Sequence, residues 1–140
     1  EIVASTLHEL GVINIFFSPG SRSTPLVLGF ERHPKLNCTP VLDERSAGFI
    51  ALGFSKRTQR PSAILCTSGS ALTNWFPAVV EASYSGTPII LLSADRPPEL
   101  QDCGAGQTIN QVNLFGAFVR SFYQISVPEL SAKSINKILS

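Results

Sequence analysis

The chain has 140 residues, of which 44% are hydrophobic and 15% are charged, and its net charge is +1 at neutral pH. This composition is typical of one globular domain with a buried sheet and excludes a disordered chain. The small net charge gives no electrostatic basis for binding nucleic acid or an anionic membrane, and no apolar run reaches the ~20 residues of a membrane span. We therefore expect no nucleic-acid partner and no membrane span. The three cysteines have no paired spacing, which favours reduced thiols and a cytoplasmic location.

Short apolar runs alternate along the chain with patterns of helical spacing. The expected strands are residues 13–17, 37–42, 62–67, 88–93 and, with the weakest pattern, 119–126. The expected helices between them are residues 24–33, 45–58 and 70–86, and the last should stop at Gly86. Continuously apolar strands are typical of a sheet covered on both faces. We predict an α/β fold of three layers, with a largely parallel sheet and helices on both faces.

Helical patterns also reach both ends of the chain, in residues 1–10 and 129–140, and the chain contains no methionine. We therefore expect these 140 residues to be a piece of a longer protein.

Polar and small residues gather where the expected strands end. They are residues 18–23, 43–46, 68–70 and 94–107. In open parallel sheets, ligands bind beyond the carboxyl ends of the strands. The sequence therefore predicts a binding site at this edge of the sheet.

The first of these segments reads SPGSRS. Either Ser21 or Ser23 is placed to cap the following helix, whose free N–H groups would then face the site. The planar fork of Arg22 suits a carboxylate or a phosphate. The alternative is a capping turn with an exposed arginine.

The segment from Ser68 to Ser70 repeats this design after another strand. Gly69 allows a close approach of the backbone, and either Ser68 or Ser70 is placed to cap the next helix. The segment lacks the lysine of a P-loop and the spacing of a GxGxxG motif. It is weak evidence for a nucleotide.

Glu44 follows an apolar strand and precedes an apolar helix, so we expect its carboxyl group to be partly buried. Such a group is suited to exchange a proton with a ligand nitrogen. The alternatives are a salt bridge to Arg45 or an acid that only favours the helix start. Asp95 and Arg96 are placed to form a local ion pair. No histidine and cysteine have the spacing of metal ligands, so we predict no metal site in this chain.

Five motifs in this order and spacing resemble the N-terminal domain of a known family, and together they cover about Gly11 to Phe115: SPGSRSTPL, DER, TSGSA, SADRPPEL and DCGAGQ. The family is the 2-succinyl-5-enolpyruvyl-6-hydroxy-3-cyclohexene-1-carboxylate synthases, which are thiamine-diphosphate-dependent transferases of menaquinone biosynthesis. It usually has asparagine at the position of Gly106, which affects one polar contact or the local loop geometry.

The resemblance implies that residues 1–140 are the pyrimidine-binding domain of a three-domain subunit, with thiamine diphosphate as cofactor. The diphosphate and Mg²⁺ would be held by a separate domain, and active sites would form between two subunits of a homo-oligomer. Glu44 matches the catalytic glutamate that hydrogen-bonds N1′ of the aminopyrimidine. By the same matching, Ser68, Gly69 and Ser70 lie on the cofactor side, and the substrate side is lined by Ser21, Arg22, Arg96 and Gln107, whose two arginines would hold carboxylates.

The reaction that the resemblance implies is decarboxylation of 2-oxoglutarate and addition of the four-carbon unit to isochorismate, on the route to menaquinone or phylloquinone. We expect the isolated fragment to be inactive, and the location to be cytoplasmic, or plastidic in a photosynthetic eukaryote. One alternative is another thiamine-diphosphate enzyme of 2-oxo acids, of the acetolactate synthase or decarboxylase type. The other is a non-catalytic α/β module that uses the two serine-glycine turns as anion pockets.

Overall fold

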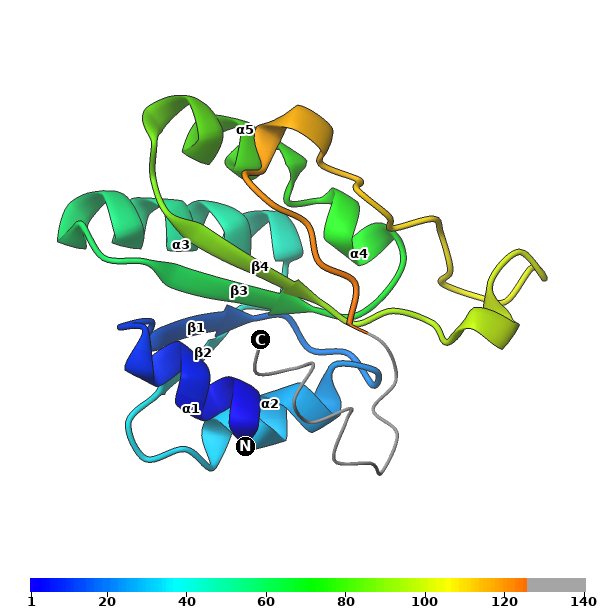
Figure 1. Ribbon diagram of the computed structural model, residues 1–140, viewed down its shortest axis with the longest axis horizontal. Coiled ribbons are helices and arrows are strands. Elements are labelled where there is room, and N and C mark those ends of the chain that lie inside the picture. The colour runs from blue at the N-terminus through cyan, green and yellow to red at the C-terminus, as the bar shows by residue number, and fades with distance from the viewer. Residues whose placement is uncertain (126–140) are drawn as a thin grey trace.

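The computed structural model describes residues 1–125, and within them four parallel strands form one sheet in the order β2-β1-β3-β4 (Figure 1). The strands are β1 (Asn14–Phe17), β2 (Asn37–Pro40), β3 (Ser62–Cys66) and β4 (Ile89–Ser93). A crossover connection with at least one helix joins each strand to the next, as parallel pairing requires. The predicted parallel sheet is confirmed.

Helices cover both faces of this sheet, which gives the predicted three layers (Figure 1). One face carries α1 (Ile2–Glu9) and α2 (Thr24–Glu31), and the other carries α3 (Glu44–Thr58), α4 (Ser70–Thr73) and α5 (Phe76–Ser85). Two short 3₁₀ helices follow β4, η1 (Pro98–Leu100) and η2 (Gly116–Phe118).

Two hydrophobic clusters fill the spaces between the layers, and β3 contributes to both. Ala63 and Leu65 pack with Phe30 of α2 on one face, while Ile64 and Cys66 pack with Trp75 on the other. All five residues of β3 are buried. This two-sided burial explains why the strand is apolar without alternation.

The predicted helix over residues 70–86 is in fact two helices. α4 ends at Thr73 and α5 begins at Phe76, with Pro77 in its first turn. Proline fits the first turn of a helix but cannot continue a preceding one, because it has no backbone N–H and its ring clashes with the preceding turn. The predicted stop at Gly86 is confirmed, since this residue caps α5 in the left-handed conformation.

The prediction of a strand over residues 119–126 is wrong for its described part, because residues 119–125 form no strand. Residue 126 and the predicted helix over 129–140 lie outside the described residues. Within residues 1–125, no helix is long and apolar enough to cross a membrane, and no three metal-ligating side chains come together. Cys66 is buried, Cys38 is half-buried and Cys103 is exposed, and all three are free thiols.

Candidate functional site

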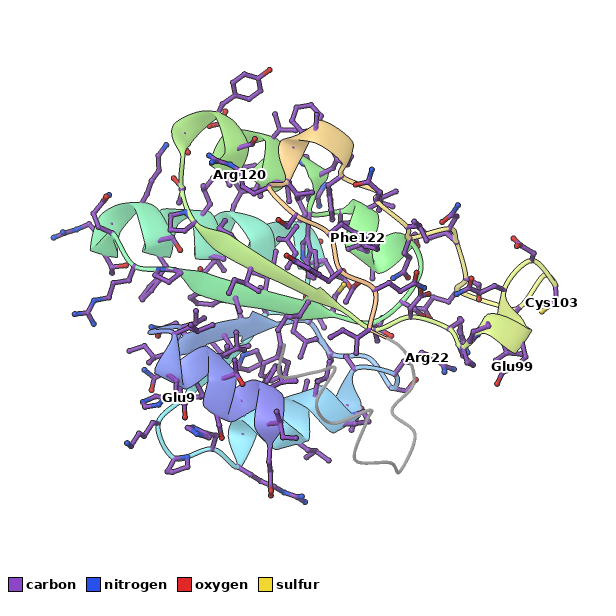
Figure 2. The ribbon with its side chains drawn as sticks, viewed as in Figure 1. Glu9, Arg22, Glu99, Cys103, Arg120 and Phe122 are labelled. Carbon is purple, nitrogen blue, oxygen red and sulfur yellow. The ribbon has the colours of Figure 1, made fainter. Side chains whose placement is uncertain are left out.

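The four segments that follow the strands meet at the carboxyl edge of the sheet. Because all strands run parallel, their carboxyl ends lie at the same edge. Figure 2 shows Arg22 at this edge, on the same side as the projecting loop that carries Glu99 and Cys103. The topology thus brings the predicted site segments to one side of the domain.

The turn after β1 is closed by bonds to its own backbone. The Ser23 hydroxyl donates to the Gly20 carbonyl at 3.0 Å, and the Thr24 hydroxyl donates to the same oxygen at 3.2 Å. Ser23 is the N-cap of α2, but no side chain bonds the helix N–H groups there. The predicted side-chain cap by Ser21 or Ser23 is therefore wrong. Ser21 is exposed and Arg22 is half-buried.

This turn packs tightly on the end of β3. A Cβ atom added to Gly20 would lie 2.4 Å from Cβ of Thr67, which is itself buried. Only glycine allows this approach, since real Cβ atoms do not come so close to another carbon. The SPGSR segment thus needs its glycine for contact with a neighbouring strand end.

Glu44 begins α3, directly after its N-cap Asp43. The Asp43 carboxylate accepts a hydrogen bond from the Ser46 N–H at 2.9 Å, which holds the pKa of Asp43 below its usual value. Arg45 lies 3.5 Å from Asp43 and not beside Glu44. The alternative of a Glu44–Arg45 salt bridge is wrong. Glu44 is half-buried, as expected, and makes no ion pair with any described residue.

The carboxylate of Glu44 lies close to the end of β3. Burial raises the pKa of the Cys66 thiol well above its usual range, and the negative charge of Glu44 raises it further. The thiol donates to the Thr67 carbonyl at 3.1 Å. Glu44 thus faces a neutral thiol in this chain.

The turn after β3 is held by Gln107 from the long loop that follows β4. The Ser68 hydroxyl donates to the Gln107 carbonyl at 3.1 Å, and the Gln107 amide donates to the Ser68 carbonyl at 3.2 Å. Gly69 has φ +80°, and a Cβ atom there would lie 2.7 Å from the Gln107 carbonyl oxygen. The expected close approach of Gly69 is thus to Gln107, which is exposed.

The predicted side-chain cap of α4 by Ser68 or Ser70 is wrong. Gly69 is the N-cap, and no side chain caps the helix by accepting a bond from its first N–H groups. The Ser68 hydroxyl instead donates to the Gln107 carbonyl.

Arg96 is held by backbone groups. Its terminal guanidinium nitrogen donates to the Gly106 carbonyl at 2.7 Å, while its Nε is buried without a partner among the described residues. Asp95 accepts from the backbone N–H of Arg96 at 2.7 Å. The expected Asp95–Arg96 ion pair does not form within the described part of the chain, so the Arg96 charge stays unneutralised there.

Sequence reasoning missed Gln111. Its side chain is only 6% exposed and accepts a hydrogen bond from the Gly69 N–H at 2.8 Å. Its amide nitrogen donates to the Ala94 carbonyl at 3.1 Å and to the Ser93 hydroxyl at 3.3 Å. Nothing in the local pattern marks this glutamine, because its partners lie on two distant segments.

A hollow lies close to the carboxyl edge of the sheet, in the loop after β4. The described residues form a hollow of about 290 Å³ inside the loop after β4, lined by parts of segment 101–112 such as Thr108 and Ile109. None of the predicted site residues lines it. This hollow is therefore not part of the candidate site.

Residues 1–114 match the family described as thiamine pyrophosphate enzyme, N-terminal TPP binding domain. The chain belongs to this family. The predicted α/β class of such a domain is also supported by a solved structure, benzoylformate decarboxylase from Polynucleobacter necessarius. It matches with a TM-score of 0.72 and 24% identity over 82% of this chain and 22% of that one. At this identity the likeness shows the fold alone.

Two relatives of this family domain are named 2-succinyl-5-enolpyruvyl-6-hydroxy-3-cyclohexene-1-carboxylate synthase. The protein of Thermosynechococcus vestitus (strain NIES-2133 / IAM M-273 / BP-1) is 53% identical over 130 residues, which are 93% of this chain and 23% of that protein. The protein of Trichodesmium erythraeum (strain IMS101) is 48% identical over 135 residues, 96% of this chain and 23% of that protein. The resemblance predicted from the motifs is confirmed. The chain spans about a quarter of the length of these relatives.

Substitution should lower the unfolding free energy at Gly20 and leave it almost unchanged at Gly106. Gly20→Ala forces a methyl group against Thr67, and overpacking of this kind typically costs ~1–3 kcal/mol of unfolding free energy. Gly106→Asn meets nothing within 4 Å and leaves the carbonyl that binds Arg96 in place, so we expect a change within about 0.5 kcal/mol. Urea unfolding of the 140-residue chain measures both. A stable Gly20→Ala variant would contradict the close approach of the two turns.

Proposed function

We propose that this chain is the pyrimidine-binding domain of a thiamine-diphosphate-dependent synthase, which decarboxylates 2-oxoglutarate and adds the four-carbon unit to isochorismate in menaquinone biosynthesis. The family match and the two synthases at 53% and 48% identity support it. The observation that carries it is a half-buried Glu44 without an ion pair, at the same edge of the sheet as Arg22 and Arg96. This is the arrangement that one proton-exchanging group and two anionic substrates require.

The residues at this edge fit the pyrimidine half of the cofactor. A carboxyl group that makes no ion pair with a described residue is free to hydrogen-bond a ring nitrogen, and Glu44 is such a group. The turn of Ser68, Gly69 and Ser70 follows the strand end that Glu44 faces, so we assign these residues to the cofactor side. Since the chain covers 23% of the synthases, we assign the diphosphate and Mg²⁺ to another domain.

Thiamine diphosphate, when bound, supplies the carbon nucleophile that attacks a 2-oxo acid. The task of Glu44 is to hold a proton at N1′ of the aminopyrimidine and to release it again. Arg22 and Arg96 would each bind a substrate carboxylate through a planar pair of N–H groups. The buried Nε of Arg96 has no partner among the described residues, so this N–H is an unsatisfied donor in the chain. Ser21 precedes Arg22, and Gln107 follows Gly106, whose carbonyl binds Arg96, so we assign both to the substrate side.

We also propose that the full-length protein is a homo-oligomer in which a second subunit covers this edge. Large apolar side chains are exposed around the start of α3, beside Glu44: Leu42 is 85% exposed, and Phe49 and Ile50 are each 44% exposed. Large apolar side chains that are exposed near one another in the chain favour an interface at this position. A partner there would exclude water from Glu44.

Two alternatives are less well supported. A simple 2-oxo acid decarboxylase handles one substrate carboxylate, whereas this edge carries two arginines without ion pairs in the described chain. A non-catalytic anion-binding module has no use for a half-buried glutamate at a strand end. It would tolerate the loss of Glu44.

The full-length protein tests the proposal directly. Titration with thiamine diphosphate and Mg²⁺, followed by an assay of CO₂ release from 2-oxoglutarate, should show cofactor-dependent decarboxylation. Addition of isochorismate should divert the four-carbon unit into a new carbon–carbon bond, detected by mass spectrometry. Equal turnover of pyruvate or benzoylformate would favour another enzyme of 2-oxo acids.

Glu44→Gln should preserve the fold and slow the reaction. Glutamine keeps the shape and can still hydrogen-bond, but it cannot exchange a proton, and general acid–base steps are commonly worth ~10²–10⁴-fold in rate. Exchange of the cofactor C2 proton for deuterium in the full-length protein, read by NMR after acid quench, measures this step. Glu81→Gln, at an exposed position on α5, is the matched control. Wild-type exchange in Glu44→Gln would remove Glu44 from the mechanism.

Arg22→Ala and Arg96→Ala should weaken substrate binding and leave the affinity for the cofactor unchanged. Each variant loses a charge-assisted contact worth ~1.5–3 kcal/mol, so KM for one carboxylate substrate should rise roughly ten- to a hundredfold. Steady-state kinetics with each substrate varied in turn assigns each arginine. Arg57→Ala, in the last turn of α3, is the exposed control. If both variants lost thiamine diphosphate affinity at unchanged KM, their assignment to the substrate side would be wrong.

A further inference from the structure

Gln111 is a buried polar side chain that the proposed reaction does not use. It comes from the loop after η1, yet it reaches the ends of both β3 and β4. Its carboxamide makes three hydrogen bonds, one as acceptor and two as donor. A buried amide that lost these partners would leave several polar groups unpaired, each at a substantial cost.

The bond to Gly69 determines which way the turn after β3 faces. The Gly69 N–H points to Gln111 at 2.8 Å, so this N–H is directed inward and not to a ligand. The other side of Gly69 is in contact with Gln107. The turn that carries Ser68 and Ser70 is thus fixed between two glutamines of one loop.

The amide nitrogen of Gln111 donates hydrogen bonds at the end of the other strand, β4. Ala94 accepts from Gln111 at 3.1 Å and lies two residues before Arg96. The N–H of Ala94 donates to the Cys66 carbonyl at 3.1 Å, which ties the same segment to the end of β3. Gln111 therefore helps to fix the backbone from which Arg96 projects.

We propose that Gln111 is a positioning residue that sets the cofactor-side turn at Gly69 and the substrate-side segment at Arg96 relative to each other. This proposal rests on the proposed function for the roles of those two segments. Gln111 acts through Gly69 and Ala94, and not on a ligand. Side chains that orient the groups around a site commonly change affinity or activity ten- to a hundredfold when they are replaced.

Two variants of the full-length protein separate the bond of Gln111 to Gly69 from its bond to Ala94. Gln111→Met keeps the size of the side chain and removes all three bonds. Gln111→Glu keeps an acceptor for the Gly69 N–H but has no amide donor for the Ala94 carbonyl. The matched control is Ser55→Ala, which breaks the buried hydroxyl pair of Ser55 and Ser62 (2.8 Å) at the opposite end of β3.

The first readout is hydrogen–deuterium exchange of the protein without cofactor, by mass spectrometry. In Gln111→Met, the peptide that contains Gly69 should exchange roughly tenfold faster than in the wild type, the loss expected for one buried hydrogen bond. In Gln111→Glu, this peptide should stay protected, while the segment after β4 exchanges faster. Ser55→Ala should change neither peptide.

The second readout is function. Gln111→Met should bind thiamine diphosphate roughly ten- to a hundredfold more weakly by calorimetry, and its KM for substrate should rise. Gln111→Glu should mainly raise the substrate KM. Ser55→Ala should lower the unfolding midpoint without changing the cofactor Kd or the KM.

Unchanged exchange and unchanged Kd in a folded Gln111→Met overturn the proposal, and so does an equal change in Ser55→Ala, because the effect would then be general destabilisation. If Gln111→Met does not fold, wild-type KM and wild-type exchange after β4 in Gln111→Glu overturn it. A wild-type protein that binds no thiamine diphosphate overturns the proposed function instead, while the exchange experiment still reports on the link to Gly69.

Discussion

The parallel pairing of β3 between β1 and β4 is the constraint on which the rest of the domain depends. All five residues of β3 are buried, and its alternate side chains enter the two hydrophobic clusters. Each neighbouring strand runs in the same direction, so every connection returns across a face of the sheet. The segments after the strands then meet at one edge, and the candidate site follows from this geometry.

Close backbone contacts shape this edge, and the described residues form one ion pair there, between Asp43 and Arg45. Gly20 approaches Thr67, and Gly69 approaches Gln107, at distances that no larger residue allows. Asp43 and Arg45 pair with each other, but Arg22, Glu44 and Arg96 make no ion pair among the described residues, and Arg96 is bonded to the Gly106 carbonyl. Charges held in this way keep their capacity for a ligand, because no internal partner neutralises them. Uncharged contacts at Gly20 and Gly69 hold this edge together, while Arg22, Glu44 and Arg96 have no ion partner among the described residues.

The sequence predicted the layers and the edge at which the site residues lie, because both follow from local patterns. Apolar runs mark buried strands, and the polar residues after them mark the strand ends. It did not predict the hydroxyl bonds of Ser23 and Ser68, since both serines also match a helix cap. Gln111 was missed for a related reason: its role depends on contacts with segments 17 and 42 residues away. The sequence does contain a signal for the division of the helix at Pro77, since proline is common in the first turn of a helix.

The surroundings of Glu44 leave its carboxyl group without an ion pair among the described residues. Asp43, and not Glu44, accepts the capping hydrogen bond and pairs with Arg45. Glu44 makes neither of these two contacts. On the sheet side Glu44 faces Cys66, whose thiol stays neutral because burial and the Glu44 charge both raise its pKa. A neutral thiol supplies no positive charge with which the carboxyl group could pair. A lysine or arginine at the end of β3 would form an ion pair with Glu44, so the small, uncharged cysteine at this position agrees with the role that we propose for this glutamate.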